Sequence, residues 1–389
     1  MMRKNRYLVL IGLLSAQITI AALYAWSIFG VALVEEMSWD ENKVLTAYFI
    51  AQFVFAFSTI LSGRLIDKKG PQITLIIGGL LYGGGLILSS MINSHHMLYI
   101  TYGIISGAGV GFVYVCPLST LIKWFPKHKG AITGLSVAVF GGGSILFKGI
   151  IERLLNYYTI SQAFLILGIV STVIIIVGAL FVGVPPDDGK VVLKKAENDY
   201  STIEMIKTTK FKKVWMMYFL AVIPGLLVLG SAKHIGLDAN LSVSSATAII
   251  AILAVSNASS RLASGALSDK FGSLKVLKGI FVITIISLLS IGLFYDVKLL
   301  FYIGIIGIAI GYGGFLSIFP TITNQQFGSY RYGANYGVMF QAYGIAALMG
   351  ILIKSVVGSY TNIFIISAVA GVIGLIISFT MSESEKAKI

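Results

Sequence analysis

The sequence predicts an all-α membrane protein with about twelve transmembrane helices in two pseudo-symmetric six-helix bundles. The first observation behind this prediction is composition: the 389 residues are 57% hydrophobic and only 12% charged, with a mean hydropathy of +0.89. A water-soluble domain carries roughly twice that share of charged residues. The second observation is the spacing of the apolar runs, and the third is an internal repeat. Because the bilayer core offers the backbone no hydrogen bonds, long apolar runs must form helices.

Runs of about twenty apolar residues, each long enough to cross a bilayer as a helix, recur along the whole chain. One long polar stretch divides them into six before and six after. We therefore expect an N-terminal six-helix bundle at 1–183, a cytoplasmic linker loop at 184–213, and a C-terminal bundle with a short cytoplasmic tail at 214–389. The predicted helices are 7–33, 43–64, 72–93, 97–122, 130–152, 160–183, 211–233, 243–266, 274–294, 298–322, 332–355 and 360–380.

The Lys and Arg residues divide unevenly between the two sides of the predicted helices. About 22 share the side of the two termini and the linker, and about 6 lie on the other, with Arg261 counted in neither set. Because cytoplasmic loops carry the excess of positive charge, both termini are predicted to be cytoplasmic in a multi-pass protein of the cell (plasma or inner) membrane. The same distribution accounts for the net charge of +13, so nucleic acid is not an expected partner.

The two halves repeat each other. "LSGRLIDKKG" (Leu61–Gly70) returns as "ASGALSDKFG" (Ala263–Gly272), each just after an even-numbered predicted helix. "GAITGLSVAVFGGG" (Gly130–Gly143) resembles "GANYGVMFQAYGIA" (Gly333–Ala346), with an offset of about 202–203 residues. Two six-helix halves with internal repeats are typical of transporters that rock around a central site.

The repeated loop segment resembles the Gly-x-x-x-Asp-Arg/Lys-x-Gly motif of the major facilitator superfamily. In that family the motif's Asp pairs with cations and helix ends to latch the cytoplasmic side shut, and a carboxylate does favour a helix N-terminus and a nearby cation. Two copies at matching places are a far more specific signal than one. The matching residues are Gly63, Asp67, Lys68 and Gly70, and again Gly265, Asp269, Lys270 and Gly272.

A narrower resemblance runs nearly end to end, to the oxalate/formate antiporter family and the related monocarboxylate transporters. It shows in "ALYAWSIFGVALVEEMSWDENKV", "NASSRLASGALSDKFG" and "YGVMFQAYGIAALMG". In that group an arginine of helix 8 binds the substrate carboxylate, and Arg261 occupies its place. The oxalate carrier adds a lysine in helix 11, where this chain has Tyr343. This departure counts against oxalate as the substrate.

The position of Arg261 points to the same role. It precedes Asp269 by eight residues, or about 12 Å of helix, which places a permanent charge near the middle of a slab about 30 Å thick. Such a charge is costly and is a sign of function. The alternatives are snorkelling to the interface and a structural ion pair. A planar guanidinium matches a carboxylate bidentately. Asn257, one turn earlier, would orient the guanidinium or bind a substrate oxygen; helix–helix contact is its alternative role.

Four tyrosines near the middle of their helices complete the candidate site: Tyr24, Tyr114, Tyr312 and Tyr343. A tyrosine presents an apolar body and one hydroxyl, which suits a small anion in a dry cavity, and ordinary packing is the alternative. Lys148 and Lys354 lie near the outer ends of their helices, at nearly repeat-related positions. They either snorkel or form a positive outer vestibule.

These residues together predict a secondary active transporter of small monocarboxylates such as lactate, pyruvate or formate. We expect a monomer in the bilayer that works by alternating access, with a proton or a counter-anion as coupled partner; symport, antiport and uniport stay open. The alternatives are an oxalate or dicarboxylate exchanger, a drug or sugar carrier, and a non-transporting nutrient sensor. We expect no enzyme, cofactor or metal, because the sequence has no Walker-type phosphate loop, metal-ligand spacing or nucleophile with a paired base.

Overall fold

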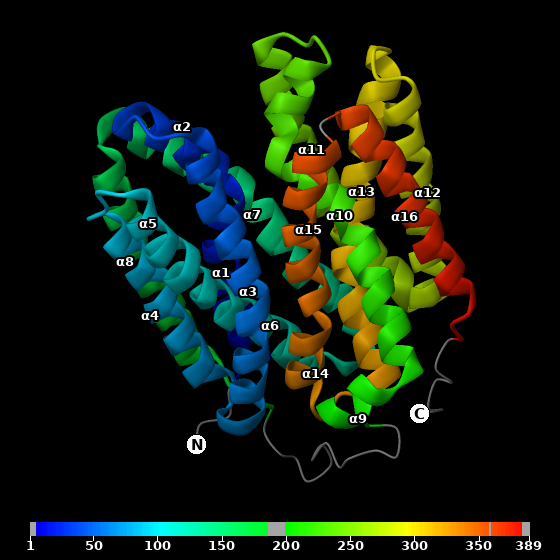
Figure 1. Ribbon diagram of the computed structural model, residues 1–389. Helices are drawn as coiled ribbons and strands as arrows, with labels where there is room; N and C mark the ends of the chain where they lie inside the picture. The colour runs from blue at the N-terminus through cyan, green and yellow to red at the C-terminus, as the bar shows by residue number, and fades with distance from the viewer. Residues whose placement is uncertain (1–4, 186–198, 358, 383–389) are drawn as a thin grey trace. The chain divides into compact units, whose positions relative to one another are not determined.

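The computed structural model describes residues 5–185, 199–357 and 359–382, and every regular element in these ranges is a helix (Figure 1). Eleven helical segments of this part of the chain are long and apolar enough to cross a membrane. The predicted all-helical membrane architecture is therefore confirmed. Two of the predicted helices, 7–33 and 332–355, are not continuous, because each is interrupted within its length.

The chain divides into two compact units. The first unit comprises Met1–Lys127, Val139–Asp199 and Tyr330–Gly344, and the second comprises His128–Ala138, Tyr200–Ser329 and Ile345–Ile389. Two helices, α7 (Lys129–Tyr157) and α15 (Gln341–Val357), pass from one unit into the other. The start of α7 therefore packs within the second unit, and the start of α15 packs within the first.

Long helices packed side by side form the first unit. α4 lies along α8, α3 lies along α6, and α14 packs against α3. A core of aromatic side chains fills the space near the middle of α3, α6 and α7. Its helices, besides the part of α7, are α1 (Arg6–Thr19), a 3-10 turn (Ile20–Ala25), α2 (Trp26–Met37), α3 (Glu41–Lys69), α4 (Pro71–Ser89), α5 (His95–Leu98), a π-helix (Tyr99–Ser106), α6 (Gly107–Trp124), α8 (Ile160–Phe181) and α14 (Tyr332–Met339).

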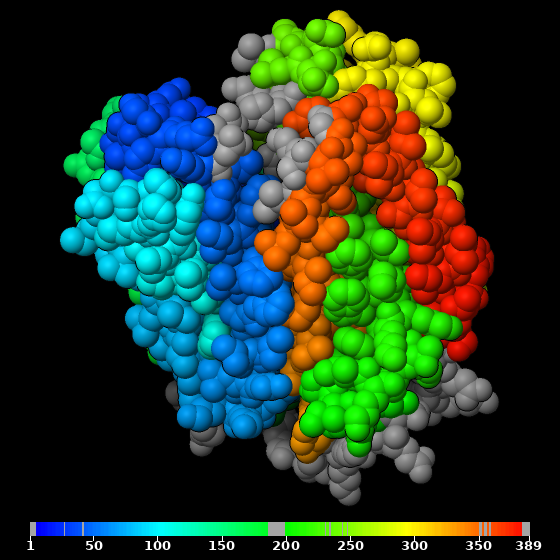
Figure 2. Space-filling view, in the orientation of Figure 1, coloured from blue at the N-terminus to red at the C-terminus, as the bar shows by residue number. Residues whose placement is uncertain are grey.

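The second unit is built in the same way. α11 and α12 both pack on α13, and α16 lies along α10 and α12. Figure 2 shows α16, in red, beside α10, in green. α16 turns large apolar side chains outward, among them Val369, Ile373 and Ile376, as expected of a face that meets lipid. The helices of this unit, besides its parts of α7 and α15, are α9 (Thr202–Lys207), α10 (Thr209–Asp238), α11 (Val243–Phe271), α12 (Ser273–Leu293), α13 (Lys298–Phe327) and α16 (Tyr360–Phe379).

The last glycine of each repeated loop segment ends a helix. Gly70 has φ +84° and Gly272 has φ +92°, a region that a residue with a Cβ rarely adopts. α3 stops directly before Gly70, and α4 begins with Pro71, whose fixed φ suits the first position of a helix. α12 begins directly after Gly272 in the same manner. The sequence thus turns sharply at two equivalent places and fixes where the preceding helix ends.

The two interrupted runs correct the prediction of unbroken helices. The first predicted helix, 7–33, ends as an α-helix at Thr19, continues as a 3-10 turn and resumes at Trp26. The run 332–355 breaks at Phe340, between α14 and α15. Side chains support the second break: Gln341 Nε2 donates to the carbonyl of Gly337 at 2.7 Å, and Thr59 Oγ1 donates to the same oxygen at 3.1 Å. These bonds satisfy a backbone group that a regular helix would satisfy itself.

Candidate functional site

Arg261 lies in the middle of α11, and its side chain is fully buried. Its Nε donates to the side-chain oxygen of Asn257, one turn earlier, at 2.9 Å. Its Nη1 donates to the main-chain carbonyl of Val137, in α7, at 2.5 Å. Both acceptors are neutral. Asn257 therefore fixes the plane of the guanidinium, and a peptide carbonyl holds one of its two outer nitrogens.

Glycines allow α7 to approach α11 so closely. A Cβ on Gly134 would lie 2.7 Å from the carbonyl oxygen of Arg261, and one on Gly265 would lie 2.6 Å from that of Gly130. Real Cβ atoms do not come so near to backbone, so small residues are required on both helices at this point. The glycines of "GAITG" and "ASGALSDKFG" thus bring the carbonyl of Val137 within reach of Arg261. We call this contact of α11 with the start of α7 the second crossing.

The carboxylate of Asp269 binds the start of α7 at one end of the second crossing. Its two oxygens accept the main-chain N–H groups of Gly130 at 3.0 Å and Ala131 at 2.8 Å, at the start of α7. The first N–H groups of a helix have no partner within it, and the helix dipole attracts an anion there. This is the helix-end contact that the sequence predicts for the motif Asp. Gly272 ends the helix that carries it, and Lys270 is exposed.

The first crossing, of α3 with α14 and the start of α15, repeats this arrangement in the first unit. Asp67 Oδ2 accepts the N–H of Ala334 at 3.1 Å, near the start of α14. The positive charges of Lys123 and Arg331 also act on this carboxylate. A Cβ on Gly63 would lie 2.1 Å from the carbonyl oxygen of Gly333. Lys68 is exposed, like its counterpart Lys270.

Three of the four predicted tyrosines meet in the aromatic core of the first unit. The ring of Tyr24 lies 4.7 Å from that of Phe140, and the ring of Tyr114 lies 5.2 Å from that of Phe340. Tyr343 stacks on Phe340 at 4.8 Å. Tyr114 and Tyr343 are buried, whereas Tyr24 is half-buried. The three hydroxyl-bearing rings therefore share one apolar cluster.

The fourth tyrosine, Tyr312, lies in α13 of the second unit and is buried. It packs against α10 at Gly225, where a Cβ would come within 2.2 Å of its ring. The next residue, Gly313, approaches Asn257: a Cβ there would lie 2.2 Å from the main-chain oxygen of Asn257. The six predicted residues therefore form two groups. Arg261, Asn257 and Tyr312 belong to the second unit, and Tyr24, Tyr114 and Tyr343 belong to the first.

Two polar residues of the first unit escaped the sequence analysis. Tyr343 Oη donates to Gln52 Oε1 at 3.3 Å, and Gln52 Nε2 in turn donates to Tyr48 Oη at 2.6 Å. Both partners are buried in α3. The signal for Gln52 was present, because a primary amide inside an apolar run needs a partner. What the sequence does not give is which helix supplies that partner.

The two outer lysines stand apart from these groups. Lys148 Nζ lies 3.8 Å from Glu152 Oε1, one turn along α7, and both side chains are accessible. A neighbouring carboxylate weakens the positive field that a vestibule would need. Lys354 lies in α15, and its side chain is outside the part of the chain that the structure describes.

Comparison with known proteins agrees with this architecture. A profile of the Major Facilitator Superfamily matches residues 8–351 and 214–388. The chain is 29% identical over 349 residues to the uncharacterized MFS-type transporter YhjX of Escherichia coli (strain K12), covering 89% of this chain and 87% of that protein. It is also 29% identical over 349 residues to the oxalate:formate antiporter of Oxalobacter formigenes, covering 88% and 82%.

Solved structures extend the likeness to the fold. The proton:xylose symporter XylE superposes with a TM-score of 0.76 at 13% identity, covering 97% of this chain and 95% of that one. At this identity the match concerns the fold alone. The resemblance identified from the sequence is confirmed, and so is the expectation that the chain is no enzyme.

Proposed function

Because the chain belongs to the Major Facilitator Superfamily, we propose that it is a secondary transporter of small monocarboxylate anions of the lactate, pyruvate or formate type. The substrate's carboxylate binds Arg261, and transport proceeds by alternating access. The observation that carries this proposal is the buried guanidinium in mid-helix, held by Asn257 and by the carbonyl of Val137.

In this mechanism the carbonyl of Val137 occupies Nη1 of Arg261 only until a substrate carboxylate binds. A hydrogen bond between two charged groups is roughly twice as strong as a neutral one, and a carboxylate takes two donors of a guanidinium at once. A substrate carboxylate therefore displaces the carbonyl from Nη1, while Asn257 keeps Nε and the plane of the group in place. Binding also neutralises a charge whose burial is costly, which lowers the barrier to closing a dry site around it.

The chemistry near Tyr343 favours one negative charge over two. A dicarboxylate such as oxalate calls for a second buried cation, because an uncompensated charge is expensive in the membrane. At the position where the oxalate carrier has its lysine, this chain has a tyrosine whose hydroxyl donates to Gln52. A neutral hydroxyl supplies no such cation, so this position favours an anion with a single negative charge. An exchanger of oxalate and formate, the activity named for one relative, is the rival hypothesis.

The motif carboxylates supply the switch. Asp67 and Asp269 each hold the start of a helix by its N–H groups, and these contacts must break if the helices α14 and α7 are to move. Electrostatic bonds of this kind are strong enough to hold one state and weak enough to be released by substrate binding energy. We assign them the role of latches.

The test is uptake of labelled lactate, pyruvate, formate and oxalate into proteoliposomes, with and without a pH gradient. Arg261→Ala removes the two outer donors and should lower uptake of the favoured anion about a hundredfold or more. Arg153→Ala, which removes an exposed arginine at the far end of α7, is the matched control and should transport normally.

Each outcome decides a separate point. Uptake driven by an inward proton gradient indicates symport, and uptake that needs internal anion indicates exchange. Selective uptake of oxalate over the monocarboxylates favours the rival substrate class. Normal uptake by Arg261→Ala contradicts the role of the arginine, and the absence of flux of any anion by the wild-type protein contradicts the transporter itself.

A further inference from the structure

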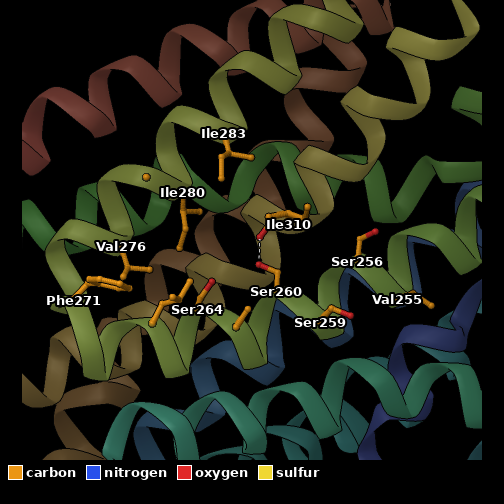
Figure 3. Close-up of a pocket in the computed structure, with 13 residues that line it drawn as sticks. Val255, Ser256, Ser259, Ser260, Ser264, Phe271, Val276, Ile280, Ile283 and Ile310 are labelled. Carbon is orange, nitrogen blue, oxygen red and sulfur yellow. Dashed lines mark hydrogen bonds between the residues drawn. The ribbon is translucent and has the colours of Figure 1, made fainter.

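A groove opens on the outer surface of the second unit, between α11 and α12 (Figure 3). Its volume is about 610 Å³. It runs along α11 from Val255 to Phe271, and Ile310 of α13 forms part of its floor. Sixteen residues of helix span about 24 Å, whereas one leaflet of the hydrocarbon core is about 15 Å deep. The groove is therefore longer than one leaflet is deep, so an acyl chain can lie along it.

Small residues create this groove, and its inner surface suits hydrocarbon. Around a Cβ placed on Gly279 of α12 there is no atom within 4 Å, so the missing side chain leaves open space. The hydroxyl of Ser260, on the floor, donates to the carbonyl of Ile310 and so needs no water. Most other lining side chains are aliphatic or aromatic. The lining residues are Val255, Ser256, Ser259, Ser260, Ala263, Ser264, Leu267, Phe271, Val276, Gly279, Ile280, Ile283 and Ile310.

One end of the groove is positively charged. Phe271 lines this end, and the ammonium of Lys270 lies 5.2 Å from the centre of its ring. Lys275, directly before the lining residue Val276, is exposed. The acid closest in sequence, Asp269, accepts the N–H groups of Gly130 and Ala131, so its charge is turned toward α7. The mouth thus presents two cations beside an apolar channel.

We propose that this groove binds an anionic phospholipid, with one acyl chain between α11 and α12 and the phosphate headgroup on Lys270 and Lys275. The apolar channel accounts for the chain, since each buried CH₂ contributes favourably. The lysines account for the charge, since cations beside a membrane surface attract anionic headgroups. The groove lies on the outer surface of the helix that carries Arg261, so the bound lipid braces that helix from the side of the bilayer.

Binding is measured by native mass spectrometry of the purified full-length protein in detergent. The probes are dioleoyl phosphatidylglycerol and dioleoyl phosphatidylcholine, which share their chains and differ in net charge. We expect the wild-type protein to retain one phosphatidylglycerol more tightly than phosphatidylcholine. Gly279→Phe fills the groove in open space, so the fold is kept, and should reduce phosphatidylglycerol to the level of phosphatidylcholine. Lys275→Gln should weaken it about fivefold.

Matched controls locate the effect. Gly84→Phe places the same ring at a glycine of α4 that also has open space around its Cβ, and Lys298→Gln removes a lysine at the start of α13. Both should retain phosphatidylglycerol like the wild type. The proposal is overturned if Gly279→Phe binds this lipid normally, if Gly84→Phe loses it equally, or if phosphatidylcholine binds as tightly and Lys275→Gln has no effect. Retention of a second copy of the protein in place of lipid would overturn it as well.

Discussion

The first and second crossings share their helix-end carboxylates and their close glycine contacts, and they differ in one residue of the carboxylate's own helix, closer to the middle of that helix. Each has a motif carboxylate at the start of a helix, Asp67 on Ala334 in one and Asp269 on Gly130 and Ala131 in the other. Each also brings two glycines together at a distance that no Cβ tolerates. Eight residues before the carboxylate the two crossings diverge: the first crossing has Thr59, and the second has Arg261.

The bonds of these two residues show what the divergence does. Thr59 Oγ1 donates to the carbonyl of Gly337 and to that of Ala56, as a hydroxyl in a helix ordinarily does. Arg261 reaches the carbonyl of Val137 with a permanent charge. The first crossing therefore uses a neutral hydrogen bond to support the break between α14 and α15. The second crossing contains a cation, to which a carboxylate can bind. The repeat supplies the scaffold, and the substrate site that we propose lies where the two copies cease to match.

The largest expected effect concerns what the crossings share. Gly63→Leu and Gly265→Leu force a side chain into the backbone of the facing helix, and each should lower the free energy of unfolding by about 3 kcal/mol. Thermal unfolding in detergent measures it. Gly84→Leu, at a helical glycine of α4 with open space, is the control and should unfold like the wild type. Equal stability of all three variants would show that the close approach is not required.

The next effect separates the two carboxylates. Asp269 accepts two N–H groups and Asp67 accepts one of those described. Asp269→Asn should therefore lower the free energy of unfolding by about 2 kcal/mol and Asp67→Asn by about 1 kcal/mol. Thermal unfolding at low and at high salt tests this, because screening should reduce the difference. A larger loss of unfolding free energy in Asp67→Asn than in Asp269→Asn would contradict this prediction.

The smallest effect concerns selectivity. Tyr343→Lys places a cation in α15, near the middle of the predicted run 332–355, and should raise the ratio of oxalate to formate uptake about tenfold. Tyr343→Phe keeps the ring and removes the hydroxyl that donates to Gln52; it should leave this ratio unchanged. An unchanged ratio in the lysine variant would mean that Tyr343 has no part in excluding a second charge.

Much of this could be predicted from the sequence, because it depends on local chemistry. The motif carboxylates, the glycines that end α3 and α11, and a cation eight residues from Asp269 are all fixed by spacing along one helix. The breaks at Ile20 and Phe340 were not predicted, since an apolar run gives no sign of a break that side chains from another helix support. Thr59 supplies one such bond to Gly337.

The grouping of the tyrosines was also beyond the sequence. In the sequence, all four are aromatic residues in the middle of apolar runs, so nothing distinguishes Tyr312 from Tyr24, Tyr114 and Tyr343. Their separation into two units depends on which helices pack together within each unit, and so on contacts between residues hundreds of positions apart. The bond from Tyr343 to Gln52 is of this kind.

The central claim is that the second crossing binds a carboxylate and the first does not. Equilibrium binding of lactate, pyruvate, formate and oxalate to the purified protein tests it most directly, with Arg261→Gln and Thr59→Val compared as equivalent positions. We predict that Arg261→Gln weakens binding of the favoured anion about a hundredfold or more and that Thr59→Val leaves it unchanged. Wild-type affinity in Arg261→Gln, or an equal loss in Thr59→Val, would contradict the claim.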